Sequence, residues 1–220
     1  MCGIVGYFGK SDAVQIILEG LEKLEYRGYD SSGIAIIENG KLSTRKLAGR
    51  LSKLKTSLEK NHICGTVGVG HTRWATHGTP SDINAHPHVN EKETIAVVHN
   101  GIIENYMPLK KELIEKGYKF NSDTDTEVVV HLIDRYYDGD LLQAVFKTVE
   151  RLKGAYALGV VSSLAPDELI AVRYESPLVL GIGDDELFVA SDIPAILKRT
   201  RNVVYLENND VVRLSNDGFE

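Results

Sequence analysis

The residue with the clearest capacity for chemistry is Cys2, which directly follows the initiator methionine. An initiator methionine is usually removed when the next residue is small, and Cys2 then carries a free α-amine beside its thiol. Because an α-amine has a pKa of about 7.7 to 8.0, it can act as the base for the thiol of its own residue, as in N-terminal threonine nucleophiles. The alternative is that Cys2 is a small apolar residue of the first strand.

A second candidate is the segment of residues 71–78, which leaves a predicted strand and enters a long loop. It places a guanidinium, an indole and a hydroxyl within four positions, at Arg73, Trp74 and Thr76. Arg73 could bind a carboxylate through a bidentate pair, and Trp74 could cover the bound ligand and exclude water. The alternative is a surface arginine stacked on a structural tryptophan.

Two further sites could stabilise charge. Asn100 and Gly101 follow a predicted strand, where a side-chain amide and a backbone N–H could both point at one oxygen, as in an oxyanion hole. The alternative is a simple turn, because Asn-Gly is a common turn pair. Asp125 falls in the first turn of a predicted helix, where it either complements the helix dipole or binds an ammonium group.

Other chemistries find little support in the sequence. Five histidines, at positions 71, 77, 86, 88 and 99, match no common zinc spacing, so we expect no metal site. The glycines at 65, 68 and 70 lie in or beside a strand and open no helix, which argues against a phosphate loop, and we expect no cofactor. Acidic residues outnumber basic ones, 31 to 25, without a basic cluster, so a small-molecule substrate is favoured over nucleic acid.

The composition is that of a globular domain. With 220 residues, 43% hydrophobic and 25% charged, the chain can bury a core without metal or disulfides, and we expect a single domain, residues 1–220. No apolar run approaches the ~18 residues that span a bilayer, and a signal peptide is not recognisable, so we expect a cytoplasmic protein. Cys2 and Cys64 should be free thiols. The basic stretch 41–60 is interpreted as a solvated face.

The first half of the chain has to position Cys2 and Arg73. Residues 3–9 predict a strand, and Asp12 with Gln15 predicts the start of a helix that continues to about residue 24. Asn39-Gly40 predicts a hairpin between strands at 33–38 and 41–47. Strands at 66–70 and 94–99 enclose a long polar loop, a feature typical of functional loops.

The second half is helical and then returns to strands. Asn105 is predicted to cap a helix that ends at Gly117, Thr124 and Glu127 form a predicted capping box, and a third helix should follow Asp140. Strands are predicted at 156–161, 168–173, 186–190, 203–206 and 210–214. Because strand runs bracket a block of helices, the fold class is α+β with antiparallel sheets.

Taken together, six motifs resemble those of the class II glutamine amidotransferases over essentially the whole chain: MCGIVG (1–6), LEYRGYDSSG (24–33), HTRWATHG (71–78), NAHPH (84–88), HNGIIEN (99–105) and SDTDTE (122–127). This resemblance implies an N-terminal-nucleophile (Ntn) hydrolase fold, a four-layer αββα sandwich with two antiparallel sheets. Tyr26, Trp74 and Ala75 favour the glutaminase domain of glutamine–fructose-6-phosphate aminotransferases over phosphoribosyl-pyrophosphate amidotransferases.

The resemblance also implies roles for individual residues. Cys2 would attack the side-chain amide of L-glutamine and form a thioester, with Asn100 and Gly101 holding the oxyanion. Arg73 would pair with the substrate α-carboxylate and Asp125 with its α-ammonium group. The remaining implied residues are Thr76 and His77 lining the site, Trp74 gating ammonia, and Arg27 positioning the Cys2 end of the chain.

The resemblance further implies a partner for the domain. In the family, a C-terminal sugar-phosphate isomerase region binds fructose 6-phosphate, makes glucosamine 6-phosphate and mediates homodimerisation, and these 220 residues do not contain it. Three alternatives stay open. They are a glutaminase domain serving another acceptor such as phosphoribosyl pyrophosphate, a glutamine-binding module without turnover, and a metal hydrolase.

Overall fold

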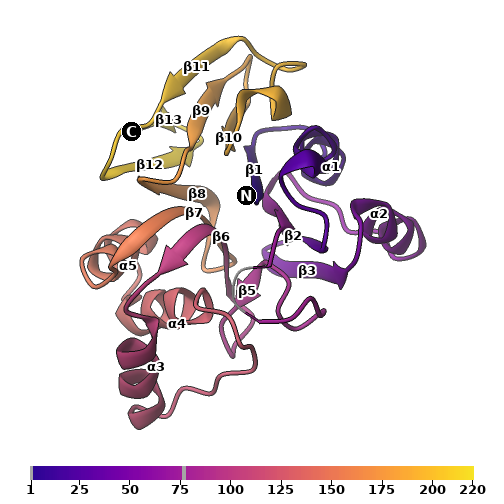
Figure 1. Ribbon diagram of the computed structural model, residues 1–220. Coiled ribbons are helices and arrows are strands. Elements are labelled where there is room, and N and C mark those ends of the chain that lie inside the picture. Colours follow the sequence, from indigo (N-terminus) through magenta and orange to yellow (C-terminus); the bar gives the residue numbers. More distant parts are fainter. Residues whose placement is uncertain (1, 76–77) are drawn as a thin grey trace.

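The computed structural model describes residues 2–75 and 78–220, which form two antiparallel sheets stacked face to face (Figure 1). The first sheet has the strand order β11 (Asn202–Tyr205), β9 (Val179–Ile182), β10 (Leu187–Ala190), β1 (Gly3–Phe8), β4 (Val67–Arg73), β2 (Ser31–Glu38) and β3 (Lys41–Ala48). The second has the order β13 (Gly218–Phe219), β12 (Asp210–Ser215), β8 (Ala165–Tyr174), β7 (Gly154–Ser162), β6 (Ile95–Ile103) and β5 (His88–Val89).

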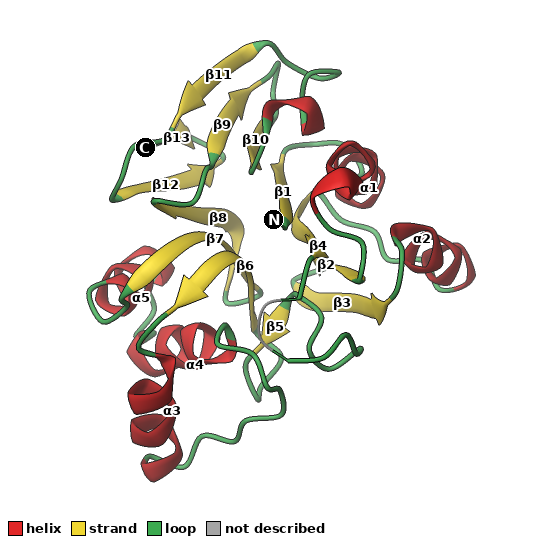
Figure 2. Cartoon of the chain, viewed as in Figure 1, coloured by secondary structure: helices red, strands yellow, loops and turns green. Residues whose placement is uncertain are grey.

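Helices cover the outer face of each sheet (Figure 2). The first sheet carries α1 (Ala13–Leu24) and α2 (Leu51–Lys60), and the second carries α3 (Tyr106–Glu115), α4 (Glu127–Tyr136) and α5 (Leu141–Val149). Two short 3-10 turns, η1 (Glu25–Arg27) and η2 (Ile193–Ala195), lie beside the first sheet. The expected α+β fold with an αββα layer order is therefore confirmed.

Three apolar clusters hold the four layers together, and the alternation of side chains along each strand explains them. In β1, Ile4 points into the cluster between the two sheets, whereas Val5 points outward into the cluster beneath α1 and α2. In β6, Ala96 faces the first sheet and Val97 packs beneath the helices of the second. Both sheets are thus apolar on both faces, as a four-layer sandwich requires.

Several predicted elements are confirmed. Asp12 caps α1, where its carboxylate accepts from the Val14 N–H at 3.0 Å. Asn39 (φ 50°) and Gly40 (φ 73°) form the tight turn between β2 and β3. Both residues adopt the left-handed conformation that this hairpin turn needs. Asp140 caps α5 through the Gln143 N–H at 3.0 Å.

Other predictions need correction. Helix α2 and strand β9 were not predicted, and the basic stretch 41–60 is an edge strand followed by a helix that buries Leu51, Leu54 and Leu58. Asn105 stands at the start of α3 but makes no cap hydrogen bond, because its amide is engaged by Arg151 and Lys153 of a neighbouring loop. None of the helices in the described ranges is long and apolar enough to cross a membrane.

Candidate active site

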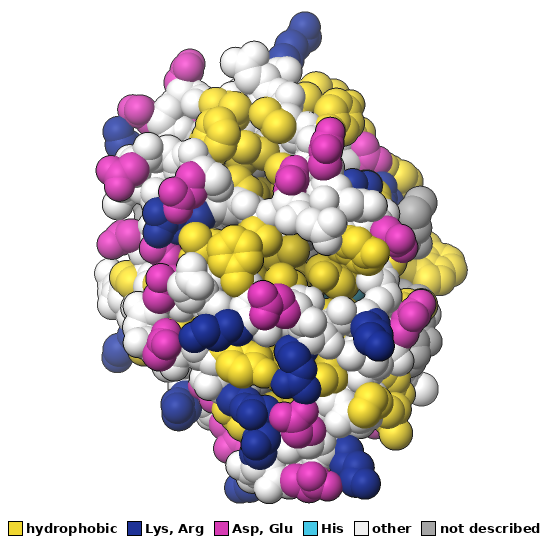
Figure 3. Space-filling model, turned by 90° about the vertical axis from the view of Figure 1, so that its left-hand side faces the viewer, with side chains coloured by type: hydrophobic (Ala, Val, Ile, Leu, Met, Phe, Trp, Pro, Cys, Tyr) yellow, Lys and Arg dark blue, Asp and Glu magenta, His cyan; other side chains and the backbone are white. Residues whose placement is uncertain are grey.

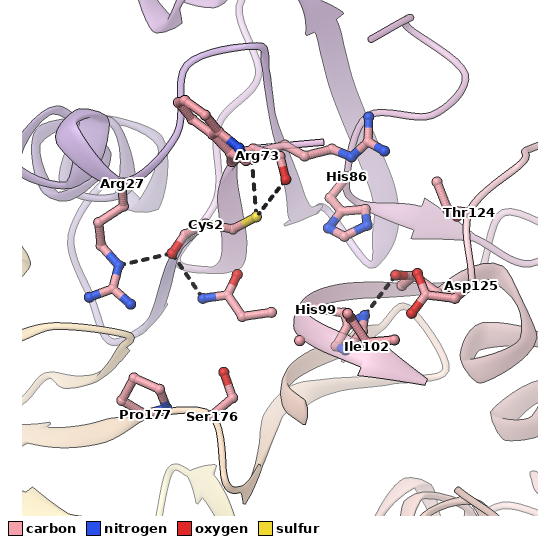
Figure 4. A pocket seen from close by; sticks show the side chains of 14 residues that line it. Cys2, Arg27, Arg73, His86, His99, Ile102, Thr124, Asp125, Ser176 and Pro177 are labelled. Atoms are coloured by element: carbon pink, nitrogen blue, oxygen red, sulfur yellow. Dashed lines mark hydrogen bonds between the residues drawn. The ribbon is translucent and has the colours of Figure 1, made fainter. Parts of the chain in front are cut away.

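A cavity of about 270 Å³ opens where β1 begins and β4 ends, at the border between the two sheets (Figure 4). It is lined from segments far apart in the sequence, by Cys2, Arg27, Arg73, Trp74, His86, His99, Asn100, Gly101, Ile102, Thr124, Asp125, Thr126, Ser176 and Pro177. The antiparallel pairing of β1 with β4 brings the start of one strand beside the end of the other, so Cys2 and Arg73 become neighbours. All seven of the predicted candidate residues that fall within the described ranges line this cavity.

The Cys2 thiol lies at the mouth of the cavity, against the backbone of Trp74. Its Sγ accepts from the Trp74 N–H at 3.2 Å and lies 3.5 Å from the Trp74 carbonyl. Burial raises the pKa of the thiol above its ordinary value, although the Trp74 N–H and the charge of Arg73 partly counteract this. A thiol with a raised pKa is protonated at neutral pH and therefore needs a base before it can attack.

The backbone of Cys2 is held from two sides. Its carbonyl accepts from Arg27 Nε at 3.0 Å and from Asn100 Nδ2 at 3.1 Å. Arg27 is in turn fixed by Asp192, whose Oδ2 lies 3.1 Å from Nη1 and also accepts from the Tyr26 hydroxyl at 2.5 Å. These contacts pin the start of β1, so the direction of the thiol is set by groups outside its own strand.

Asn100 and Gly101 lie inside β6, which extends to Ile103, so the turn interpretation of this pair is wrong. They pair with Ala157 and Tyr156 of β7. Gly101 adopts a φ of 124°, and a Cβ there would lie 2.0 Å from the Ala155 carbonyl oxygen. Glycine is therefore required both by the backbone conformation and by the close approach of β7.

Arg73 ends β4 and reaches toward Thr124 and Asp125 (Figure 4). Its side chain is 4% exposed, its Nη2 donates to the Gly78 carbonyl at 3.1 Å, and its Nη1 lies 4.0 Å from Asp30 Oδ1. The alternative of a surface arginine is thus wrong. Trp74 is 48% exposed at the cavity rim.

Asp125 lies in the segment before α4, not in the first turn of the helix as predicted. Its Oδ2 accepts from the Ile103 N–H at 2.7 Å, which fixes the buried carboxylate at the end of β6. The predicted capping box is also wrong. Thr126 occupies the cap position without a side-chain cap bond, and Thr124 instead contacts His88 and Ser122.

Glu127 organises the segment that carries Asp125. Its carboxylate accepts from the Asn121 N–H at 2.8 Å, from the Ser122 N–H at 2.8 Å and from the Ser122 hydroxyl at 2.6 Å. Burial alone would raise its pKa, but the neighbouring His131 ring, 3.6 Å away, and the hydrogen bonds from Asn121 and Ser122 outweigh this and lower the pKa to about 2. Glu127 therefore holds Asn121 and Ser122 against the start of α4 as long as it is ionised.

This gives a prediction about stability and pH. Because the pKa of Glu127 is lower in the folded than in the unfolded chain, its contribution is complete above about pH 4.3 and is lost as the pH falls toward about 2. We expect Glu127→Gln to lower the melting temperature at pH 7 by roughly 3–10 °C, and the difference from wild type to shrink below about pH 4. Calorimetry between pH 2 and 7 measures the melting temperatures, with Glu115→Gln at an exposed position as the control. A difference between Glu127→Gln and wild type that does not change with pH would contradict the prediction.

A family model of the glutamine amidotransferase domain matches residues 56–217, most of the chain. The chain belongs to this family. The resemblance read from the six motifs is therefore confirmed. Glutamine amidotransferase domains are catalytic, so the chain is identified as the domain of an enzyme.

Relatives and solved structures of this amidotransferase domain agree. The glutamine–fructose-6-phosphate aminotransferases (isomerizing) of Clostridium acetobutylicum and Clostridium tetani are 57% and 58% identical over the whole chain, which spans 36% of the length of each. Among solved structures, glutamine phosphoribosylpyrophosphate amidotransferase from B. subtilis has a TM-score of 0.87 at 28% identity. That match covers all of this chain and 48% of the other.

Sequence reasoning missed several residues that line the cavity of this amidotransferase domain. His86, His99, Thr124 and Thr126 were not assigned to the site, although each lies within or directly beside a segment that was singled out. Their signal was proximity to those motifs. Ser176 carried no such signal, because it reaches the cavity only through the packing of the turn between β8 and β9.

Two predicted residues of the amidotransferase site, Thr76 and His77, lie outside the described residues. Within residues 2–75 and 78–220, no group of three or more His, Cys, Asp or Glu side chains is arranged to hold a metal ion. Cys2 and Cys64 are both free, as predicted.

Proposed function

We propose that this domain hydrolyses the side-chain amide of L-glutamine to glutamate and ammonia, with Cys2 as the nucleophile. The observation that carries the proposal is that one cavity holds the thiol, the Asn100-Gly101 pair, and a buried cation and anion. A glutamine molecule has a side-chain amide that can be attacked, and its α-carbon carries a negative carboxylate and a positive ammonium group. The residues of the cavity complement each of these groups.

The chemistry starts with removal of the thiol proton by the α-amine of Cys2. Sγ then forms a bond to the amide carbon of glutamine, and the carbonyl oxygen becomes an oxyanion that the Asn100 amide and the Gly101 N–H stabilise. The proton passes to the amide nitrogen, the C–N bond breaks, and ammonia leaves a glutamyl thioester. Water then attacks the thioester, releasing glutamate and restoring the thiol.

Arg73 and Asp125 anchor the substrate in this proposal. Arg73 pairs with the α-carboxylate and Asp125 with the α-ammonium group, since a zwitterion needs one cationic and one anionic partner. The family resemblance assigns Thr76 and His77 to the substrate pocket, and in this proposal Trp74 gates the passage of ammonia. Support comes from the burial of both charged side chains beside the thiol.

The anchoring roles can be separated with substrate analogues. We expect Arg73→Lys to raise KM for glutamine roughly 10–100-fold, because a lysine cannot form the bidentate pair. It should have a much smaller effect with the α-amide of glutamine, which lacks the carboxylate. Asp125→Asn should raise KM for glutamine but not for N-acetylglutamine, which lacks the ammonium group. Equal losses with all three substrates would assign both residues a structural role.

The acceptor of the ammonia is proposed from the relatives. Because relatives that are 57–58% identical are named glutamine–fructose-6-phosphate aminotransferases, we assign fructose 6-phosphate as acceptor and a sugar-phosphate isomerase region as the partner of this domain.

Exposed Val204 and Tyr205 on edge strand β11 support a docked partner. Figure 3 shows acidic and basic side chains interspersed around hydrophobic ones on one face. The proposal includes a homodimeric full-length protein in the cytoplasm.

The test is release of glutamate and ammonia from glutamine by the 220-residue chain, after intact mass has shown that Met1 is absent. We expect equal amounts of both products without any sugar phosphate, insensitivity to chelators, and γ-glutamyl hydroxamate when hydroxylamine intercepts the thioester. Glutamine binding without release, from folded and Met1-free protein, would instead identify a glutamine-binding module. Loss of activity to chelators would favour a metal hydrolase.

A further inference from the structure

The His71 side chain extends from the first sheet to the second beside the proposed oxyanion hole. It lies on β4, where it pairs with Ile4 of β1, and its ring is fully buried. Its Nε2 lies 3.0 Å from the His99 carbonyl oxygen and 3.0 Å from Asn100 Oδ1, both on β6 of the second sheet. One ring nitrogen of His71 therefore connects the first sheet to the residue proposed to hold the oxyanion.

The partners of Nε2 decide where its proton is. A carbonyl oxygen and an amide oxygen only accept hydrogen bonds, so Nε2 of His71 has to carry the proton and donate to both. Burial lowers the pKa of His71 to about 3, so the ring is neutral and Nδ1 is unprotonated. Nδ1 is buried and has no hydrogen-bond partner, which agrees with a nitrogen that has no proton to donate.

His86 agrees with this assignment. Its Nδ1 lies 3.2 Å from His71 Nε2, and two protonated nitrogens cannot face each other at that distance without repulsion. Nδ1 of His86 is thus unprotonated, and the proton of that ring lies on Nε2. Burial lowers the pKa of His86 well below its ordinary value, so this ring is also neutral.

The orientation of the Asn100 amide follows from the hydrogen-bond partners at its Nδ2 and Oδ1 ends. One end faces the Cys2 carbonyl at 3.1 Å, which requires the NH2 group there, and the other faces the proton of His71. Turning the amide around would place two acceptors together at Cys2 and two donors together at His71. In the observed orientation one N–H of Asn100 binds the Cys2 carbonyl, and the second remains for a substrate oxyanion.

We propose that His71 is a positioning residue of the glutaminase reaction: its Nε2–H holds Asn100 Oδ1, so that the Asn100 NH2 group faces Cys2 and the carbonyl under attack. This inference rests on the proposed function. His71 touches neither the thiol nor the substrate and acts through Asn100 alone. Its hydrogen bond also polarises the amide, which strengthens the N–H groups as donors.

The first test needs no turnover. Two-bond ¹H–¹⁵N correlation spectra of the unchanged protein report which imidazole nitrogen carries the proton, and His71→Gln assigns the signal by its disappearance. We expect a neutral ring with the proton on Nε2 between pH 6 and 8. A proton on Nδ1, or a doubly protonated ring, would overturn the inference whether or not the protein hydrolyses glutamine.

The second test is kinetic. We expect His71→Phe, which keeps a ring but removes the donor, to lower kcat roughly 10–100-fold with KM for glutamine changed less than about 3-fold, since a misplaced oxyanion donor costs less than a deleted one. His71→Gln, which restores an N–H donor, should recover most of this loss. The matched control is Thr148→Val on α5, which removes a buried hydrogen-bond donor outside the cavity and should leave kcat unchanged.

A double-mutant cycle distinguishes action through Asn100 from a general structural role. If His71 acts through Asn100, His71→Phe combined with Asn100→Ala should be no slower than Asn100→Ala alone. Additive losses, or a kcat of folded His71→Phe within about 2-fold of wild type, would refute the proposal. If His71→Phe fails to fold, the NMR measurement of the tautomer decides. If the wild-type chain has no glutaminase activity, the proposed function is wrong. The NMR measurement of the His71 tautomer still tests the inference about His71 in that case.

Discussion

Replacing Cys2 with alanine is expected to reduce glutamate release by at least about 10⁴-fold, the scale of loss when a protein nucleophile is removed. The physical reason is that, among the residues the structure describes, the cavity offers Cys2 as its only thiol. The Asn100-Gly101 pair can stabilise an oxyanion only after a nucleophile has attacked. Initial rates of glutamate formation measure the loss.

The chain supplies a matched control for this substitution. Cys64 is the second of two cysteines, it is exposed, and its Sγ lies 3.3 Å from Glu38 Oε1, far in the fold from the cavity lining. Cys64→Ala should therefore retain full activity, and alkylation of that variant should label Cys2 alone and inactivate it. Cys2→Ala should still bind glutamine, as measured by calorimetry. Unchanged turnover by Cys2→Ala would refute the nucleophile assignment.

Local patterns predicted the elements whose signals are contained in a few neighbouring residues. Asn39-Gly40 specifies its hairpin because the turn needs two residues in the left-handed conformation. Asp12 and Asp140 specify helix starts through hydrogen bonds two or three residues away. Cys2 was singled out because removal of Met1 would leave an α-amine beside its thiol, and Arg73 because an indole and a hydroxyl lie within three residues of it.

Features that depend on distant partners could not be predicted from local patterns. Asn100-Gly101 resembles a turn by itself, but pairing with β7 keeps it in a strand. Thr124 and Glu127 have capping-box spacing, yet Glu127 finds better donors at residues 121 and 122 and Thr124 turns to His88. Helix α2 was missed because three buried leucines among basic residues form a weak apolar stripe.

The same dependence on distant partners explains why the histidines were hard to interpret. In the sequence, the histidines at 71, 86, 88 and 99 suggested at most a weak metal site. In the structure, each of these histidines has a ring nitrogen within hydrogen-bond distance of another group; for example, His99 Nδ1 lies 2.8 Å from Thr126 Oγ1, and His88 Nε2 lies 2.9 Å from Thr124 Oγ1. Only the juxtaposition of β4, β6 and the segment before α4 assigns these rings to hydrogen bonding around the cavity.

A chain whose Cys2 nitrogen is blocked by a preceding residue is expected to be nearly inactive. Within residues 2–75 and 78–220, the hydrogen-bond partners of Sγ are the N–H and carbonyl of Trp74, and neither can take a proton from the thiol. Since burial raises the pKa of Cys2, its thiol is protonated at neutral pH. In the proposed mechanism the α-amine of Cys2 is the base, and an amide in its place has no basic lone pair.

A cleavable N-terminal extension tests this within one preparation. Before cleavage, glutamate release should be at least about 10³-fold slower than after a protease has exposed Cys2 as the first residue, the scale expected when the base of a nucleophile is lost. After cleavage, kcat/KM should rise with pH through about 7 to 8, because only the neutral amine accepts the proton. Glutamine binding by the uncleaved chain separates loss of the base from obstruction of the cavity. Full turnover by an uncleaved chain would exclude the amine and require another base near Sγ.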